Sequence, residues 1–177
     1  MPRTSYRKRF EQDLKEMIES LNLSDPQKKQ FLRMRWLEQV VWMEAAANRS
    51  RLGYYSLRLV AIVGSVLVPA LVSLNISGDV AAFVRWLTFS LSLLVAISVA
   101  VEEFFHLGER WRHYRRTVEL LKSEGWYYFQ KSGPYQDYET HEQAYPVFAS
   151  QVETISRQEV EVYITQIVRE KEKQSET

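Results

Sequence analysis

Two long apolar stretches follow one another in the middle of the chain. Residues 59–78 contain no charged side chain, and residues 79–101 contain only Asp79 and Arg85. A helix rises 1.5 Å per residue, so about 20 apolar residues cross the roughly 30 Å hydrocarbon core of a bilayer. Arg85 lies near the start of its stretch, where its long side chain reaches the headgroups. The pattern predicts transmembrane helices at 59–78 and 79–101; a buried helical hairpin in a soluble domain is the alternative.

A short polar segment separates the two stretches. Residues 75–79 read NISGD, which is typical of a tight turn, so the two spans are expected to form an antiparallel hairpin. Pro69 lies inside the first span, and its missing N–H leaves the carbonyl of Ser65 without its helical partner. We expect a kink there, which is either static or a gating hinge formed by Pro69 and Ser65.

The flanking regions show helical periodicity. Apolar residues fall on one helical face within 5–21, and a second helix is expected to start with Ser24 as its cap, Pro26 in its first turn and Gln27 at the capping-box position. No further proline occurs before Arg58, so this helix should run into the first span. Its apolar residues cover a wide arc, which predicts burial on more than one side.

After the second span, apolar residues recur in steps of four and three from Ala100 to Tyr128. This heptad pattern predicts that the second membrane helix continues without interruption and packs against a partner helix. Residues 132–134 (SGP) should end it. After Pro146, further apolar positions predict a last amphipathic helix.

These patterns together predict an all-α membrane protein with a two-helix transmembrane hairpin. The expected parts are N-terminal cytoplasmic helices (1–58), the two spans (59–78 and 79–101), and a cytoplasmic helical extension with a C-terminal helix (102–177). The apolar residues of the soluble helices exceed what one short chain can bury, so self-association into a homo-oligomer is expected.

The distribution of Lys and Arg predicts the orientation. Of the 23 Lys and Arg residues, 12 precede Leu59 and 10 follow Val101, and only Arg85 lies within the hairpin. The positive-inside rule therefore places both termini in the cytoplasm. The first 13 residues have no apolar core, so we expect no cleavable signal peptide.

Composition excludes several classes of function. The 23 basic and 22 acidic residues nearly balance, which argues against a strongly basic nucleic-acid binder. The absence of Cys excludes disulfides, thiolate catalysis and Cys-based metal sites. Glycine-rich phosphate loops, Gly-x-Ser-x-Gly elbows and HExxH motifs are missing as well, so we expect a protein that is not an enzyme.

Small and polar residues on the second span suggest a pore. A pore needs such groups on one face of a membrane helix and, at a mouth, a ring of charge. The candidate pore-lining residues are Thr88, Ser92, Ala96 and Ala100 at steps of four, leading to Glu103, with Glu102 and Ser98 on an adjacent stripe. We hypothesise that this face conducts cations, with Glu103 or Glu102 at the cytoplasmic mouth. Alternatively, the small residues permit close helix packing, and the two Glu pair with Arg58.

Two His and two Glu also share a helical spacing. Glu102, His106, Glu109 and His113 lie at i, i+4, i+7 and i+11, a set that would bind Zn²⁺ or Fe²⁺ with help from a partner helix. One straight helix supplies only two adjacent ligands, so a solvated polar face is the favoured interpretation. We expect no metal and no other cofactor.

The segment after the second span resembles a known family. Residues 111–124 (WRHYRRTVELLKSE), followed by 133–135 (GPY), resemble the SLATT-like family of two-transmembrane bacterial domains. Pro69 in the first span and the spacing of Phe148, Val152 and Ile155 fit the same resemblance, which covers roughly residues 30–170. It implies a protein of the bacterial inner membrane that oligomerises into pores, often beside a nucleotide-sensing domain. With no room for such a domain here, the chain resembles the standalone members.

The residues of this string are expected to be structural. Arg115 and Glu119 have the i,i+4 spacing of an ion pair, and Arg116 is placed to meet lipid phosphates or a neighbouring subunit. The expected subunit or lipid contacts are Trp111, Tyr114, Arg115, Arg116 and Glu119.

The sequence thus predicts a homo-oligomeric membrane ion channel or pore that favours cations. A non-conducting scaffold whose cytoplasmic helices recruit another protein is the first alternative, and a ligand or nucleotide sensor that signals through the hairpin is the second. The expected partners are the lipid bilayer, further copies of the chain and an unidentified cytoplasmic protein, but no nucleic acid.

Overall fold

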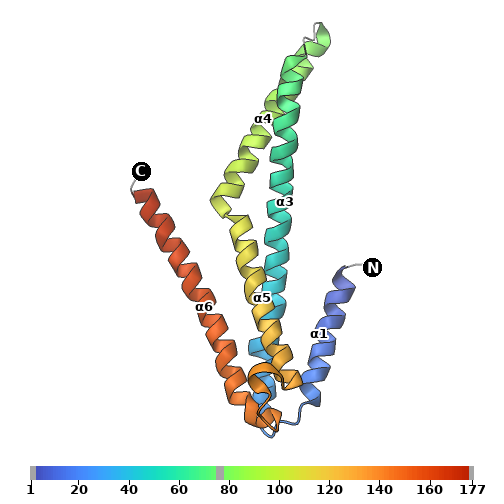
Figure 1. The fold of residues 1–177 in the computed structure, drawn as a ribbon. Coiled ribbons are helices and arrows are strands. Elements are labelled where there is room, and N and C mark those ends of the chain that lie inside the picture. Colours follow the sequence, from blue (N-terminus) through green and yellow to red (C-terminus); the bar gives the residue numbers. More distant parts are fainter. Residues whose placement is uncertain (1–2, 75–77, 176–177) are drawn as a thin grey trace. The chain divides into compact units, whose positions relative to one another are not determined.

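The computed structural model describes residues 3–74 and 78–175, with the side chains of residues 8–158 apart from 75–77 and Asp79. Within these ranges the chain is helical and contains no strand (Figure 1). The elements are α1 (Arg3–Ser20), α2 (Pro26–Phe31), the π-helix η1 (Leu32–Leu37), α3 (Glu38–Ser73), α4 (Asp79–Phe105), α5 (Leu107–Gln130), the 3-10 helix η2 (Gly133–Tyr135) and α6 (His141–Ser175). The predicted all-helical fold is confirmed, while residues 75–77 of the predicted turn lie outside the described residues.

The chain divides into two compact units. The bundle unit consists of Met1–Ala45 and Tyr114–Thr177, and the hairpin unit consists of Ala46–His113. Helices α3 and α5 contribute residues to both units.

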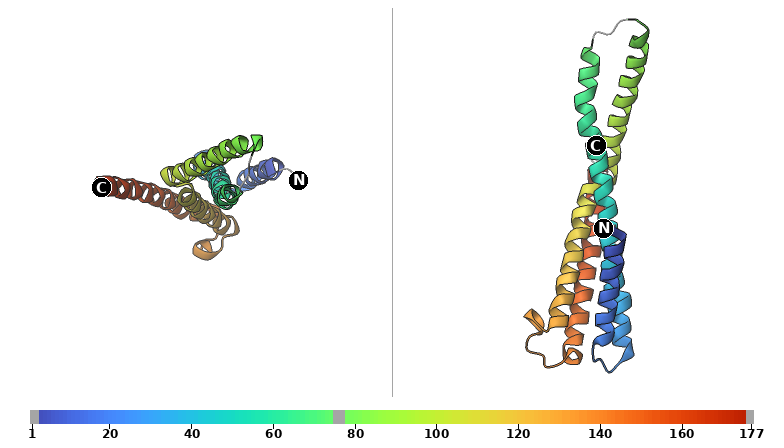
Figure 2. Two further views of the ribbon diagram at one scale, coloured as in Figure 1. Left: turned by 90° about the horizontal axis from the view of Figure 1, so that it is seen from above. Right: turned by 90° about the vertical axis from the view of Figure 1, so that its right-hand side faces the viewer.

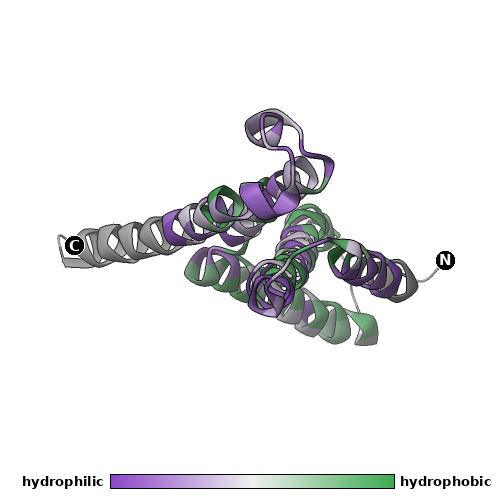
Figure 3. Ribbon diagram, turned by 90° about the horizontal axis from the view of Figure 1, so that it is seen from below, coloured by the Kyte–Doolittle hydropathy of each residue, from purple (hydrophilic) through white to green (hydrophobic). Residues whose placement is uncertain are grey.

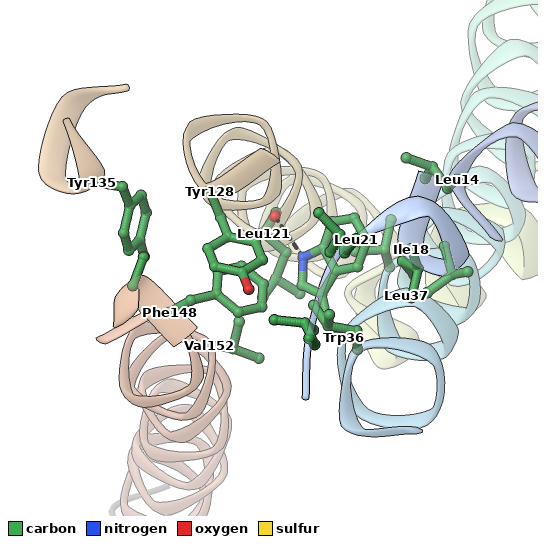
Figure 4. Close-up of a cluster of buried hydrophobic side chains, with 14 of the residues drawn as sticks. Leu14, Ile18, Leu21, Trp36, Leu37, Leu121, Tyr128, Tyr135, Phe148 and Val152 are labelled. Carbon is green, nitrogen blue, oxygen red and sulfur yellow. Dashed lines mark hydrogen bonds between the residues drawn. The ribbon is translucent and has the colours of Figure 1, made fainter. Parts of the chain in front are cut away.

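The core of the bundle unit surrounds Trp36 of η1. This side chain is 1% exposed, and its indole N–H donates a hydrogen bond to the carbonyl of Leu121 on α5 at 2.9 Å (Figure 4). A Cβ at Gly125, one turn further along α5, would overlap the indole ring. The glycine therefore gives the indole the space to lie against the backbone of α5.

The π-helix explains how this segment buries more than one side. Hydrogen bonds in a π-helix join residues five apart, so Leu32 and Leu37 come to the same side of the turn. Leu37 lies toward Ile18 of α1, whereas Trp36 lies toward α5 and Val152 of α6 (Figure 4). Burial on more than one side is thus confirmed for this helix, although Met34 and Trp42 of the predicted arc are exposed.

The outer helices of the bundle bury one face each. Leu14 and Ile18 of α1 are buried, as are Phe148 and Val152 of α6, at the i,i+4 spacing of one helical face. Figure 3 shows the corresponding mixture of hydrophilic and hydrophobic residues on α1 and on the described part of α6. The ring of Tyr128 stacks on Phe148 with centroids 4.4 Å apart, which joins α5 to α6.

The start of the second helix differs from the prediction. The cap is Asp25, whose Oδ1 accepts a hydrogen bond from the backbone N–H of Gln27 at 2.8 Å, and not Ser24. Ser24 instead donates from its backbone N–H and its hydroxyl to Glu142 of α6, at 3.0 and 2.8 Å. Both Ser and Asp can cap a helix, and the tertiary partner decides between them. From Pro26 to Ser73 the helical elements follow one another without a gap, as predicted.

The predicted continuous helix after the second span is wrong. Helix α4 ends at Phe105 and α5 begins at Leu107, because His106 adopts a left-handed conformation with φ 48°. The backbone remains hydrogen-bonded, since the N–H of His106 donates to Glu102 and its carbonyl accepts from Glu109 and Arg110. His106 therefore ends one helix and starts the next.

The last helix begins earlier than predicted. It starts at His141, so Pro146 lies in its second turn and not before it. Thr140 supports this start, because its carbonyl accepts from the N–H of Ala144 and its hydroxyl from the N–H of Gln143. A proline near a helix start removes only one hydrogen bond, which this capped start tolerates. Helix α5 ends at Gln130, shortly before residues 132–134, as predicted.

Candidate functional site

Helices α3 and α4 form an antiparallel hairpin in the hairpin unit (Figures 1 and 2). Gly64 of α3 is buried against Val95 of α4, whose side chain occupies the space that a Cβ at Gly64 would need. A missing side chain lets two helix backbones approach closely, as in small-residue contacts of membrane helices. The predicted antiparallel pairing of the two apolar stretches is therefore present.

The surface of this hairpin is apolar and exposed. Both helices are long and apolar enough to cross a membrane, with a mean hydropathy of 2.0 over 18 residues. Only 6% of the first of these windows and 0% of the second is buried. A core helix of a soluble protein is mostly buried, whereas most of the surface of these two helices is exposed. Large apolar side chains of the hairpin unit that are at least 59% exposed are Leu52, Leu59, Val66, Val72, Val80, Phe83, Trp86, Phe89 and Phe104.

The predicted pore-lining residues differ in their exposure. Thr88 and Ser92 are half-buried and donate their hydroxyls to the carbonyls of Val84 and Thr88, at 2.8 Å each, whereas Ala96, Ala100 and Glu103 are exposed. Four residues turn an α-helix by roughly 400°, so each step of four moves the stripe about 40° around the axis. The predicted stripe therefore spans about 120° around the axis from Thr88 to Ala100. Whether these residues line a pore stays a prediction.

A groove of about 340 Å³ lies between α3 and α4. Its wall includes Ser65, predicted as a hinge residue, and Ser98 and Glu102, predicted on one stripe of the second span. Arg58 of α3 lines the groove as well. Among the described residues no ion pair joins Arg58 and Glu102, although the sequence made such a pair an alternative. The groove is the feature that sequence reasoning did not foresee, because it depends on how the two helices cross.

The hydroxyl groups of the two serines in this groove donate hydrogen bonds to backbone carbonyls of their own helices. Ser65 donates to the carbonyl of Ile62 at 2.8 Å, and Ser98 donates to the carbonyl of Leu94 at 2.7 Å. Helix α3 continues past Pro69 to Ser73, so the proline does not end it. The hinge at Pro69 and Ser65 stays a prediction.

The other end of the hairpin carries a cation and aromatic rings. Arg85 lines a groove of about 610 Å³ together with Thr88 and Ser92. Trp86 is 70% exposed and packs edge-to-face with Phe89, with centroids 6.0 Å apart. Exposed Trp and Arg at the end of an apolar helix are typical of a membrane interface.

The hairpin lies within a region that matches a known protein family. A family model described as a protein of unknown function (DUF4231) matches residues 38–143, more than half of the chain. The chain belongs to the DUF4231 family. The DUF4231 region begins at the first residue of α3 and ends in the first turn of α6, so it contains the whole hairpin and all of α5. No curated protein and no solved structure matches the chain. The resemblance to SLATT-like domains stays a prediction.

Within the DUF4231 region, the string after the second span has structural contacts. Arg115 and Glu119 form the predicted i,i+4 ion pair at 2.9 Å. Trp111 packs edge-to-face on Tyr55 in the hairpin unit, with centroids 5.9 Å apart. In the bundle unit, Tyr114 packs on Trp42 at 5.8 Å, and Arg116 is exposed. The subunit and lipid contacts expected of these residues stay predictions.

The helix break also separates the candidate metal ligands. Glu102 belongs to α4, Glu109 and His113 belong to α5, and His106 is the left-handed residue between them. The single helical face assumed for these four residues is therefore wrong. In the part of the chain that the structure describes, no three His, Asp or Glu side chains gather closely enough to hold a metal ion.

A second groove, of about 620 Å³, lies on the bundle unit of this DUF4231 protein. Met34 and Trp42 line it and are 57% and 54% exposed, and charged residues of α1, η1 and α3 line it as well. Sequence reasoning placed both side chains in a buried arc. These lining residues are Glu11, Lys15, Gln30, Arg33, Met34, Leu37, Glu38, Val41, Trp42 and Ala45.

Charged contacts join α6 to the preceding helices of the bundle. Glu142 accepts hydrogen bonds from Lys28 and Ser24, and these lower its pKa to about 2. The hydrogen bonds from Arg35 to Glu153, at 2.6 and 2.9 Å, lower the pKa of Glu153 in the same way. Burial raises the pKa of Tyr128. These groups stabilise the bundle, and none of them lies in the hairpin.

Proposed function

We propose that this DUF4231 protein is a membrane protein whose α3–α4 hairpin crosses the bilayer twice and whose copies assemble into a cation-conducting pore. The observation that carries the proposal is the low burial of the two apolar helices, 6% and 0%. Leaving such a surface in water is unfavourable by roughly 25 cal/mol per Å² of apolar area. Lipid around the hairpin removes this penalty, and the backbone of both helices is already hydrogen-bonded, as a bilayer requires.

The pore requires more than one copy of the chain. Two helices that contact each other cannot enclose an aqueous path, so the path must lie between hairpins. Thr88 and Ser92 supply hydroxyl groups, and Glu102 and Glu103 supply negative charge at the end of α4. A ring of these carboxylates from several copies would concentrate cations at the mouth.

Membrane insertion is tested first and conduction second, both on the full chain. Wild-type protein should float with lipid vesicles and resist extraction by alkaline carbonate. A size-defined oligomer in a planar bilayer should then pass cation currents, and Glu103→Gln and Glu102→Gln should lower the preference for K⁺ over Cl⁻ several-fold. Glu109→Gln, an exposed carboxyl on α5, is the matched control and should keep the wild-type preference. Protein that stays with the soluble fraction contradicts insertion, and silent oligomers contradict the pore.

A scaffold is the second candidate, favoured by the groove around Met34 and Trp42. Apolar side chains that are more than half exposed and rimmed by charge are typical of protein-binding surfaces. A scaffold would bind a partner protein there and pass no current. Trp42→Ala would then weaken partner binding while membrane insertion is unchanged.

A further inference from the structure

The groove between α3 and α4 begins at the boundary between charged and apolar sequence. Arg58 directly precedes the first apolar stretch, and Glu102 directly follows the second. Because the two helices are antiparallel, both residues lie at the same end of the groove. The lining then follows both helices for about two turns, to Ser65 on α3 and Val95 on α4, roughly 10 Å from the charged end. The groove thus has a charged mouth and a body within the apolar stretch.

The body of this groove suits a hydrocarbon chain. Apart from the two serines, its lining consists of apolar side chains, including Ala61, Ile62 and Val99. The hydroxyl hydrogens of Ser65 and Ser98 are donated to backbone carbonyls, so neither serine demands a polar occupant. An aliphatic chain therefore leaves no donor of this wall without a partner.

The mouth presents opposite charges that are not paired with each other. The described structure contains no ion pair between Arg58 and Glu102, although both line the same 340 Å³ groove. A guanidinium favours phosphate, and a carboxylate favours a primary ammonium group that can donate hydrogen bonds. A zwitterionic headgroup with a phosphate next to an ammonium group complements both charges at once.

We infer that the Arg58–Glu102 groove binds phosphatidylethanolamine, with its phosphate on Arg58, its ammonium on Glu102 and an acyl chain along the groove. The inference rests on the proposed insertion of the hairpin into a bilayer. Phosphatidylglycerol offers a phosphate to Arg58 but leaves Glu102 facing a net negative headgroup. Phosphatidylcholine has no N–H to donate to Glu102. Charge complementarity therefore ranks phosphatidylethanolamine above phosphatidylglycerol, and hydrogen bonding to Glu102 ranks it above phosphatidylcholine.

The test measures lipid binding to the full-length protein in detergent by native mass spectrometry. Phosphatidylethanolamine, phosphatidylcholine and phosphatidylglycerol with the same acyl chains are added in turn. Wild-type protein should bind phosphatidylethanolamine about tenfold more tightly than either other lipid, which is about 1.4 kcal/mol. Glu102→Gln should remove the preference over phosphatidylglycerol, and Arg58→Gln should weaken the binding of both lipids.

Two variants act as controls for charge and for folding. Glu103→Gln removes the neighbouring exposed carboxylate outside the groove and should keep the wild-type preference. Ala61→Phe fills the groove without changing any charge and should weaken phosphatidylethanolamine binding, while circular dichroism confirms unchanged helix content. Equal binding of all three lipids by the wild type, or equal losses in Glu103→Gln and Glu102→Gln, overturns the inference.

The experiments distinguish failure of the lipid site from failure of the proposed function. If the wild type does not float with vesicles, insertion fails and the lipid site fails with it. If it floats and shows no lipid preference, the lipid site alone fails. Conduction is recorded independently and does not enter the comparison.

Discussion

Gly125 gives the indole of Trp36 the space that it occupies against α5. Gly125→Ala would place a Cβ inside the ring, so the bundle must shift. Alanine is the better helix former by about 1 kcal/mol, but overpacking typically costs about 1–3 kcal/mol. We expect a net loss of unfolding free energy, measured by denaturant titration in detergent. Ser123→Ala, an exposed change on the same helix, should have almost no effect. A Gly125→Ala protein more stable than the wild type would contradict this packing.

Glu142 makes the stability of the bundle depend on acid pH. Its pKa is lowered to about 2 in the folded protein, mainly by the hydrogen bond from Lys28 and then by those from Ser24. A lowered carboxyl pKa means that the unfolded chain binds the proton first, so the contribution is fully present above about pH 4.5 and is lost as the pH falls toward 2.

Thermal unfolding between pH 6 and pH 2 tests this contribution. Glu142→Gln should lower the Tm at pH 6, and its difference from the wild type should shrink as the pH approaches 2. Glu38→Gln, an exposed carboxyl of the same unit, should follow the wild type at every pH. A difference for Glu142→Gln that does not change with pH would argue against the ionised contact.

At the scale of elements, His106 stores backbone strain between α4 and α5. A non-glycine residue in the left-handed region is disfavoured by about 1–2 kcal/mol, and glycine adopts it freely. We therefore expect His106→Gly to stabilise the protein by about 1 kcal/mol in denaturant titration. His113→Gly, inside α5, is the matched control and should destabilise it by about 1 kcal/mol. Loss of stability in both variants would show that the helix break is not strained.

The boundary between α4 and α5 at His106 is one that the sequence pattern does not predict. The periodicity from Ala100 to Tyr128 continues across His106 without proline, and Gly108 comes two residues after the break. Close tertiary packing lies beside the break and is not visible in the periodicity: a Cβ at Gly108 would stand 2.9 Å from the ring of Tyr54. By contrast, the end of α5 at Gln130 follows from the local stop signal at residues 132–134.

At the scale of the whole molecule, the sequence predicted the apolar hairpin but not its groove. Charge-free stretches of this length determine two long apolar helices almost by themselves. The groove depends on the crossing at Gly64, which brings Arg58 and Glu102 to one mouth. In the bundle, the pairing of Ser24 with Glu142 joins residues 118 positions apart, which no local pattern can indicate.

The proposed topology predicts the sidedness of chemical labelling. The chain contains no cysteine, so single cysteines can be introduced without background. In sealed vesicles, Asn22→Cys and Gln136→Cys should react with a membrane-impermeant maleimide from one side. Leu74→Cys, at the end of α3, should react only from the other side. Labelling of Asn22→Cys and Gln136→Cys from opposite sides would contradict a hairpin that crosses the membrane twice.

The π-helical turn at Leu32–Leu37 makes the length of that segment as important as its composition. A π turn holds one residue more than an α turn. Deleting an outward residue such as Met34 would remove the extra residue and allow an ordinary α-helix to close. The larger rotation per residue of an α-helix would offset the missing residue, so Leu32 and Trp36 would stay nearly in phase. A single-residue deletion should therefore be tolerated better here than inside α3, where it would turn the preceding residues by about 100° relative to the following ones.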